Sequence, residues 1–332
     1  MIGVLGATGA VGSRVAGLLE PHGVRRGSRS GPGQRVDAYD PAGLAAFCAG
    51  CRLVVNCAGP SHRLLDRVAR AAFAAGADYV DAAGDDPLFG LLSSAGTAGR
   101  TAIVSAGMLP GLTGLLPGLV TEHGAHRLDV YTGGRDRLTT AAAEDVLLSG
   151  GYGEALAAWR GGVRVSRALT PAEDVALPYF PERVSLHPYL TTEAERLARR
   201  LGVGESHWYT VTSKERVLAL ARGSAGDLER AAALELAGRA PYYAMLFQAG
   251  GPSGIRTLAL RTADTYALTA AVAAHAAEEV LAGAVPPGAH YAADVLDPEA
   301  VLAAIAPVAQ VDLSRVLPFV DPLAPPIEEG EL

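Results

Sequence analysis

Short apolar runs alternate with longer segments of helical periodicity through residues 1–110. The chain predicts strands at 2–5, 23–28, 35–39, 53–56, 79–81 and 101–105, and helices at 11–19, 41–49, 62–75 and 87–98. Strands that alternate with helices need crossover connections, which are typical of parallel sheets. Because most of these strands are short apolar runs, we expect both faces of the sheet to be buried. The pattern predicts an α/β fold built on a Rossmann-type, doubly wound parallel sheet.

The pattern changes after residue 124, where strands and helices no longer alternate regularly. Here the chain predicts strands at 127–132, 162–167, 183–186, 208–213 and 255–261, and helices at 141–159, 191–201, 214–222 and 227–246. This mixture predicts an α+β domain at residues 125–262, inserted after a first domain at residues 1–124. We expect residues 263–332 to form C-terminal helices that return to the first domain.

The helix predicted at 266–281 is rich in alanine on more than one side, and its charges, Glu278 and Glu279, stand near its C-terminal end. The helix dipole disfavours acidic groups at that end, so burial explains the composition better than solubility does. We expect this helix to pack against the first domain or against a partner subunit.

Composition narrows the class of protein. The chain has 332 residues, of which 49% are hydrophobic and 19% charged, and its net charge is −7. This is enough apolar material for a large core, and it leaves no broad basic surface for a nucleic acid. The first residues carry no secretory signal, and His275, Glu278 and Glu279 interrupt the longest apolar tract. We expect a soluble cytoplasmic protein with neither a nucleic-acid nor a membrane partner.

Three cysteines are too few for a disulfide framework. Cys48, Cys51, Cys57 and His62 could be drawn as a zinc site. However, Cys57 continues a buried strand, and its side chain would not converge with a pair at a helix end. We expect small buried thiols and no metal.

A glycine-rich loop, Gly6-Ala7-Thr8-Gly9-Ala10-Val11-Gly12, follows the first strand and opens the first helix. This context is the one that a dinucleotide-binding fingerprint requires. Gly6 would allow the tight turn, Gly9 would let the pyrophosphate approach the backbone, and Gly12 would let the helix pack close to the sheet. The free N–H groups at the start of the helix would then hold the phosphates, which makes Thr8, Ala10 and Val11 predicted contacts as well.

The end of the second strand indicates which dinucleotide binds. A carboxylate at this point usually binds the ribose 2′-OH of NAD. Here Arg25, Arg26, Ser28 and Arg29 stand in that window, which contains no acid. An arginine can pair with a 2′-phosphate, so the sequence favours NADP (NADPH), with Ser28 and Arg29 as the contacts.

Two further strands end in small residues, Asn56-Cys57-Ala58-Gly59-Pro60 and Ser105-Ala106-Gly107. In a doubly wound sheet, ligands lie beyond the carboxyl ends of the strands. Small residues there leave room for the ribose and nicotinamide, so Asn56, Ala58, Gly59, Pro60 and Gly107 complete the predicted cofactor site.

These segments resemble the saccharopine dehydrogenase (saccharopine reductase-like) family. The motifs that carry the resemblance are the glycine-rich loop, Gly27-Ser28-Arg29-Ser30, the segments 54–60 and 75–81, Pro110-Gly111, and Asp264-x-Tyr266-x-Leu268-Thr269-Ala270. The resemblance is close over residues 1–120 and looser over 260–285. It implies a Rossmann NADP-binding domain and a substrate and dimerisation domain. Members reduce C=N bonds of imines made from amino acids, and some relatives reduce C=C bonds of carrier-bound acyl chains.

Reduction of a neutral imine also needs a proton donor. Short-chain dehydrogenases take it from a Tyr-x-x-x-Lys pair, but here the one lysine is Lys214 and Thr210 stands four residues before it. The remaining candidates are Tyr152, His207 and Tyr209, and His62 and Asp81 rank below them. An imine that arrives already protonated would need no donor.

We therefore expect an NADPH-dependent oxidoreductase of the imine reductase type (CH–NH donors), acting in amino-acid or specialised metabolism as a homodimer. Its substrate would be a small molecule, either free or tethered to a carrier protein. Two alternatives remain open: a trans-acting enoyl reductase on a carrier-bound acyl chain, and an NADP-binding sensor without catalysis.

Overall fold

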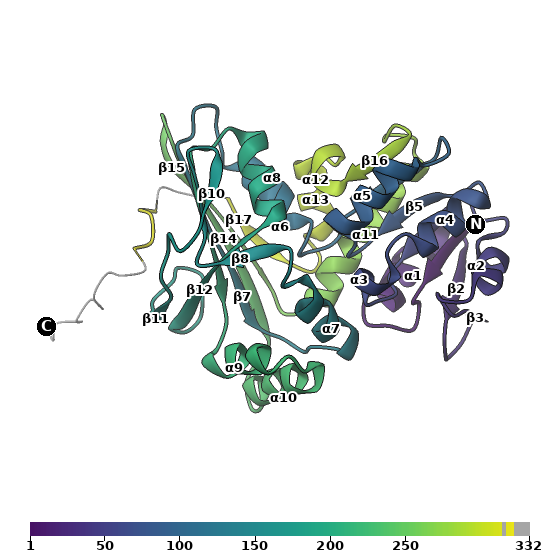
Figure 1. Ribbon diagram of the computed structural model, residues 1–332, viewed down its shortest axis with the longest axis horizontal. Helices are drawn as coiled ribbons and strands as arrows, with labels where there is room; N and C mark the ends of the chain where they lie inside the picture. Colours follow the sequence, from purple (N-terminus) through teal and green to yellow (C-terminus); the bar gives the residue numbers. More distant parts are fainter. Residues whose placement is uncertain (314–316, 322–332) are drawn as a thin grey trace, which may run out of the picture. The chain divides into compact units, whose positions relative to one another are not determined.

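The computed structural model describes residues 1–313 and 317–321. The chain divides into two compact units, each assembled from separate segments (Figure 1). Of the described residues, unit 1 comprises 1–115, 139–149 and 264–309, and unit 2 comprises 116–138, 150–263, 310–313 and 317–321. Residues 314–316 and 322–332 lie outside the described part of the chain.

Unit 1 is built on a seven-stranded sheet in the order β16-β6-β5-β4-β1-β2-β3, and every pairing in it is parallel. Its strands are β1 (Ile2–Leu5), β2 (Val24–Ser28), β3 (Gln34–Arg35), β4 (Leu53–Asn56), β5 (Asp78–Asp81), β6 (Thr101–Val104) and β16 (Gly288–Tyr291). Its helices are α1 (Gly12–Leu18), the 3-10 helix η1 (Glu20–His22), α2 (Pro41–Cys48), α3 (Ser61–Leu64), α4 (Arg67–Ala74), α5 (Asp86–Ala95), α6 (Leu112–Leu115), α7 (Thr140–Ser149), α11 (Thr265–Leu281), α12 (Ala292–Val295) and α13 (Pro298–Ile305).

Helices cover both faces of this sheet. Residues of α2, α4 and α5 share one apolar core with alternate strand residues such as Leu5 and Val54. The long helix α11 packs against α1, β4 and β5, which is the packing that its alanine-rich sequence predicts. Asp264 caps α11 by accepting from Ala267 N–H at 2.9 Å, and its other oxygen lies 2.6 Å from Arg14 of α1. The predicted Rossmann-type, doubly wound sheet is confirmed.

Unit 2 is built on a mixed sheet of ten strands, with the main path β10-β9-β13-β7-β14-β15-β17. Its strands are β7 (Arg127–Arg135), β8 (Gly153–Ala155), β9 (Ala158–Arg160), β10 (Val163–Val165), β11 (Ala172–Val175), β12 (Val184–Thr191), β13 (Glu205–Val211), β14 (Tyr242–Gly251), β15 (Gly254–Thr262) and β17 (Gln310–Asp312). Its helices are the 3-10 helix η2 (Leu116–Leu119), α8 (Thr192–Leu201), α9 (Lys214–Arg222) and α10 (Ala225–Leu236). β7 and β13 are parallel, and the other pairings are antiparallel.

Two predicted helices were too long. The helix expected at 141–159 ends at Ser149, and β8 and β9 follow it. Gly150-Gly151 interrupts the helical pattern there, and glycine is a poor helix former. The helix expected at 227–246 ends at Leu236, because Gly238 and Pro241 follow it, and the aromatic run that begins at Tyr242 forms β14.

The C-terminal segment expected at 263–332 divides between the units. Residues 264–309 belong to unit 1, whereas β17 pairs with β15 in the sheet of unit 2. Residues 139–149, expected within the inserted domain, also belong to unit 1.

Candidate functional site

The glycine-rich loop connects β1 to α1 at the carboxyl end of the parallel sheet. Gly6 has φ +78°, a left-handed conformation that favours glycine. The backbone N–H groups of Gly6 and Ala7 donate to the carbonyl oxygen of Gly27 at 2.8 and 3.0 Å, and Gly9 N–H donates to Gly6 O at 2.9 Å. These bonds hold the loop as a tight turn against β2.

The three glycines of the loop have different surroundings. A Cβ atom on Gly12 would lie 2.2 Å from Gly6 O, and one on Gly6 would lie 2.7 Å from Ala58 N. A Cβ atom on Gly9 would meet a single described atom within 4 Å, Gly6 O at 3.2 Å, and Thr8 and Gly9 are exposed. The fold of the loop therefore excludes side chains at Gly6 and Gly12, while Gly9 leaves an open surface.

The start of α1 provides hydrogen-bond donors at that surface. Within the described part of the chain, no acceptor lies opposite the backbone N–H groups of Ala10 and Val11. Unpaired N–H groups at the positive end of a helix dipole are suited to bind a phosphate. We call this surface, which the sequence predicts to bind a pyrophosphate, the pyrophosphate cradle.

The three arginines near the end of β2 have different environments. Arg25 donates to the carbonyl oxygens of Phe47 and Ala49, both at 2.6 Å, and so closes the end of α2. Arg26 pairs with Glu20 at 2.6 Å. Arg29 is exposed and has no ion pair or hydrogen bond among the residues that the structure describes. Of the three guanidinium groups, only that of Arg29 is available to a ligand.

The loop that carries Arg29 lies against the glycine-rich loop. A Cβ atom on Gly31 would lie 2.8 Å from Cγ2 of Thr8. Ser28 is buried, and its hydroxyl donates to the carbonyl oxygen of Ser30 at 2.5 Å, which shapes this turn. The turn that carries Arg29 therefore stands beside the pyrophosphate cradle, where the sequence predicts the adenosine ribose of a dinucleotide.

The ends of β4 and β5 are joined by a buried carboxylate. Asp81 accepts hydrogen bonds from Tyr79 OH at 2.5 Å and Asn56 Nδ2 at 2.9 Å, and from the backbone N–H groups of Ala83 and Gly84. Burial, together with the Asp81 charge, raises the pKa of Tyr79 well above its ordinary value. Asp81 has four donors and is only 2% exposed, so its role is to hold the strand ends together.

The other cofactor positions predicted from the sequence lie at the same end of the sheet. The amide oxygen of Asn56 accepts from Ala58 N–H at 3.1 Å, so both atoms of this amide have protein partners. Ala58, Gly59 and Pro60 are half-buried. A Cβ atom on Gly107 would lie 2.2 Å from Ala82 O, so glycine is required there by the protein itself.

A histidine–aspartate pair that the sequence did not single out lies beyond the end of β4. His62, on α3, has Nδ1 3.2 Å from Oδ1 of Asp145, on α7. Ser61 Oγ donates to the same oxygen at 3.2 Å. The histidine alone was a minor candidate, and its partner was missed because it stands 83 residues away, in a segment expected to belong to the other domain. No local pattern in the sequence links them.

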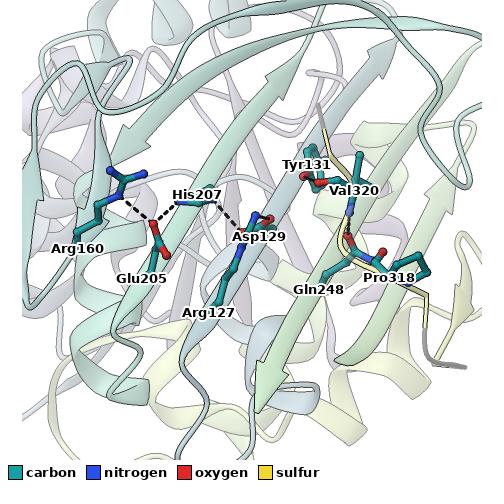
Figure 2. Close-up of polar contacts among 9 residues, drawn as sticks. All are labelled: Arg127, Asp129, Tyr131, Arg160, Glu205, His207, Gln248, Pro318 and Val320. Carbon is teal, nitrogen blue, oxygen red and sulfur yellow. Dashed lines mark hydrogen bonds and ion pairs between the residues drawn. The ribbon is translucent and has the colours of Figure 1, made fainter. Parts of the chain in front are cut away.

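His207 belongs to a row of charged groups across the sheet of unit 2 (Figure 2). Its Nδ1 lies 3.2 Å from Asp129 Oδ1, and its Nε2 lies 2.9 Å from Glu205 Oε1. Arg127 binds Asp129 through two nitrogens at 2.9 and 2.7 Å, and Arg160 binds Glu205 at 2.9 Å. Burial alone would raise the pKa of Glu205, but the hydrogen bond from His207 holds it below the ordinary value. Both ring nitrogens of His207 are therefore engaged within the sheet.

The two tyrosine candidates of unit 2 lie in different places. Tyr209 is stacked on Tyr131 with ring centroids 5.0 Å apart. Burial, and then the Asp129 charge, raises the pKa of Tyr209 to about 12, which makes its hydroxyl a weaker proton donor. Tyr152 stands between α7 and β8, where its carbonyl oxygen accepts from Thr192 N–H at 3.1 Å. His207 and Tyr209 share one face of β13, because they are two residues apart on a strand.

Residues near the C-terminus cross the same face of this sheet (Figure 2). Gln248 Nε2 donates to Pro318 O, and Val320 N–H donates to Gln248 Oε1, both at 3.0 Å. The guanidinium of Arg127 lies 4.4 Å from the ring centroid of Phe319. The buried members of the polar row, Asp129 and His207, are therefore part of a structural layer.

Over residues 1–313 and 317–321, no group of three or more His, Cys, Asp or Glu side chains is placed to hold a metal ion. In the same residues, no helix has both the length and the apolar character needed to cross a membrane.

Comparisons with known proteins bear on the fold. Neither family models nor characterised protein sequences match the chain. Among solved structures, it is similar to the apo histidine-tagged saccharopine dehydrogenase (L-Glu forming) from Saccharomyces cerevisiae, with a TM-score of 0.63 and 13% identity over 94% of this chain and 99% of that one. It is also similar to a probable dehydrogenase from Thermotoga maritima, with a TM-score of 0.45 and 11% identity over 92% and 94% of the two chains. The chain has the fold of saccharopine dehydrogenase, which confirms the resemblance expected from its motifs at the level of the fold.

Proposed function

We propose that the protein is an NADPH-dependent oxidoreductase that reduces the C=N bond of a small imine. The observation that carries the cofactor assignment is the difference between Arg25 and Arg26 on β2, which have protein partners, and Arg29 just after it, which has none among the described residues. Arg25 binds backbone carbonyl oxygens and Arg26 binds Glu20, whereas Arg29 is exposed beside the pyrophosphate cradle. A guanidinium at this position attracts the 2′-phosphate of NADPH. It does not replace the carboxylate that usually accepts a hydrogen bond from the ribose 2′-OH of NADH.

The residues present fit a dinucleotide. Ala10 and Val11 offer backbone donors to the pyrophosphate, the open surface at Gly9 admits it, and Arg29 meets the ribose phosphate. The half-buried small residues Ala58 and Gly59 leave room toward the nicotinamide. NADPH, when bound, supplies the hydride, and the chain supplies orientation, charge and a proton.

The choice of an imine rests on the fold. The yeast structure with the same fold is a saccharopine dehydrogenase by its name. The resemblance of the motifs to this family implies reduction of C=N bonds of imines made from amino acids, so we assign the same bond type here. The cytoplasmic homodimer and the place in amino-acid or specialised metabolism stay predictions from the sequence.

Two measurements test the proposal. The first is the dissociation constant of NADPH and of NADH, and we expect NADPH to bind at least tenfold more tightly. The second is NADPH consumption with a panel of cyclic imines and of enoyl thioesters, with expected turnover on imines alone. Turnover on enoyl thioesters would move the reaction to C=C bonds, and tight binding without turnover on either class would indicate a sensor.

A further inference from the structure

Three side chains from two helices meet beyond the carboxyl end of β4. Ser61 and His62 begin α3, and Asp145 lies on α7. Asp145 Oδ1 is 3.2 Å from His62 Nδ1, 3.2 Å from Ser61 Oγ and 3.4 Å from the backbone nitrogen of His62. The side chain of His62 is 11% exposed and that of Asp145 24%, so water screens the pair only in part.

Part of this arrangement serves to join the two helices. Pro60 precedes α3 and gives it no side-chain cap, so Asp145 supplies the acceptor for the first turn. Arg63 and Glu144 form a second link at 3.6 Å. Neither function requires an imidazole at position 62. Helix packing therefore leaves one part of the cluster unexplained, the contact of the imidazole Nδ1 of His62 with Asp145.

The pair lies against a loop of the predicted cofactor site. A Cβ atom on Gly59 would be 3.2 Å from Asp145 Oδ2. This loop follows β4, and ligands of doubly wound sheets bind beyond such strand ends. All of these residues belong to unit 1.

We infer that His62 is the proton donor of the proposed reduction and that Asp145 is its positioning residue. This inference rests on the proposed function. Asp145 accepts from Nδ1–H, which fixes the orientation of the ring and stabilises its cationic form, and Nε2–H then serves the substrate.

The step balances as follows. Hydride from NADPH forms the new C–H bond at the imine carbon. The π electrons of the C=N bond move to nitrogen, which takes the proton from His62 Nε2. The products are the amine and NADP⁺, and His62 regains its proton from water.

The reaction should depend on the charge of the pair. Asp145 is the carboxylate that faces the ring, while Glu144 on the same helix is paired with Arg63. Asp145→Asn keeps an oxygen acceptor and removes the negative charge. We expect this variant to lower kcat on a neutral imine and to leave kcat unchanged on a permanently cationic iminium, which needs no proton.

The decisive experiment compares two substrates that differ in their need for a proton. A cyclic imine at alkaline pH is neutral and requires a donor, whereas its N-methyl iminium analogue is permanently cationic and requires none. His62→Gln should lower kcat on the neutral imine by about 10²-fold or more, the usual size of general acid catalysis. It should leave kcat on the iminium and the Kd of NADPH close to wild type.

His22→Gln is the matched control, because His22 is an exposed histidine of the same unit whose nearest carboxylate is 3.8 Å away. It should leave both substrates unchanged. An equal loss on both substrates in His62→Gln, or no loss on either, would overturn the assignment of His62 while the proposed function stands. A wild-type protein that binds NADPH and reduces neither substrate would overturn both.

Discussion

His207 and Asp129 face each other on the parallel strands β13 and β7, with Nδ1 of the imidazole 3.2 Å from Oδ1 of the carboxylate. Asp129 has no exposed surface, and Arg127 binds it through two hydrogen bonds. Because the buried carboxylate lies between the guanidinium of Arg127 and the imidazole of His207, it connects the polar row, whose burial inside the sheet would otherwise be unfavourable. This is a role in stability, and it has a measurable consequence.

Asp129→Ala should lower the free energy of unfolding of unit 2 by about 3–5 kcal/mol, since it leaves a partly buried guanidinium without its partner. Both tryptophans, Trp159 and Trp208, lie on strands of this unit, so urea unfolding followed by tryptophan fluorescence measures the free energy of unfolding of unit 2 directly. Glu205→Gln is the control: its side chain is 37% exposed, and the expected loss is about 1 kcal/mol or less. Similar losses in the two variants would contradict a special role for Asp129.

Gly9→Val should abolish NADPH binding and leave the protein folded. A Cβ atom at position 9 meets only Gly6 O, at 3.2 Å, so a small shift accommodates it in the protein. The branched side chain then occupies the surface that the pyrophosphate needs. Fluorescence titration with NADPH and a thermal unfolding curve check the two halves of this prediction.

Gly12→Val provides the contrast, because its Cβ would lie 2.2 Å from a backbone oxygen and the loop itself must move. We expect it to lower the Tm as well as to prevent binding. Wild-type NADPH affinity in Gly9→Val would show that the cofactor binds elsewhere.

Arg29→Ala should weaken NADPH binding by about ten- to a hundredfold and leave NADH binding nearly unchanged. A hydrogen bond to a charged group contributes about 1.5–3 kcal/mol, and each ~1.4 kcal/mol is tenfold in affinity. Higher ionic strength should narrow the difference between the two cofactors in the wild type, because Arg29 is exposed.

Arg26→Ala is the matched control for Arg29, since Arg26 stands in the same segment but is paired with Glu20. It should keep the wild-type ratio of the two dissociation constants. If Arg29→Ala weakens both cofactors equally, the side chain supports the fold, and the preference for NADPH needs another source.

Cys48 should resist alkylation in the native protein. Burial, with a smaller contribution from Cys51, raises the pKa of Cys48 to about 11, so at pH 8 about one thiol in a thousand is ionised. We expect iodoacetamide at pH 8 to leave Cys48 unmodified until the protein is unfolded in urea, as read by mass spectrometry of its peptide.

The raised pKa of Cys48 also determines how stability changes with pH. Above the ordinary pKa of 9.0, the unfolded chain loses the Cys48 proton before the folded chain does. The contribution of Cys48 to stability is therefore complete below pH 9 and falls as pH rises toward 11. Cys48→Ala should make the free energy of unfolding decline less steeply over this range, and an unchanged slope would contradict the shift.

Local chemistry explains which parts of the fold and of the candidate site could be predicted from the sequence. The strand, glycine-rich loop and helix at residues 2–18 are contiguous, and Gly9 and Gly12 approach atoms of the loop itself. Arg29 could be selected because it follows a strand end directly. The lengths of two helices were overestimated, because apolar periodicity does not tell a helix from a buried strand over short runs.

The pair of His62 and Asp145 could not be predicted in this way, since its members are 83 residues apart and α7 belongs to unit 1. Nor could the sequence show that both nitrogens of His207 are already engaged, because its partners are set by strand register, which is a property of the assembled sheet.

The sequence by itself determined the class of fold, the position of the glycine-rich loop and the candidate arginines, because hydrophobic periodicity and glycine spacing act between neighbours in the chain. Only the tertiary structure decided which polar side chains have partners. It paired Arg25 and Arg26 within the protein, joined His207 to Asp129, and brought Asp145 to His62. The physical reason is that a hydrogen bond depends on distances of about 3 Å between atoms, and chain folding, not chain order, sets those distances.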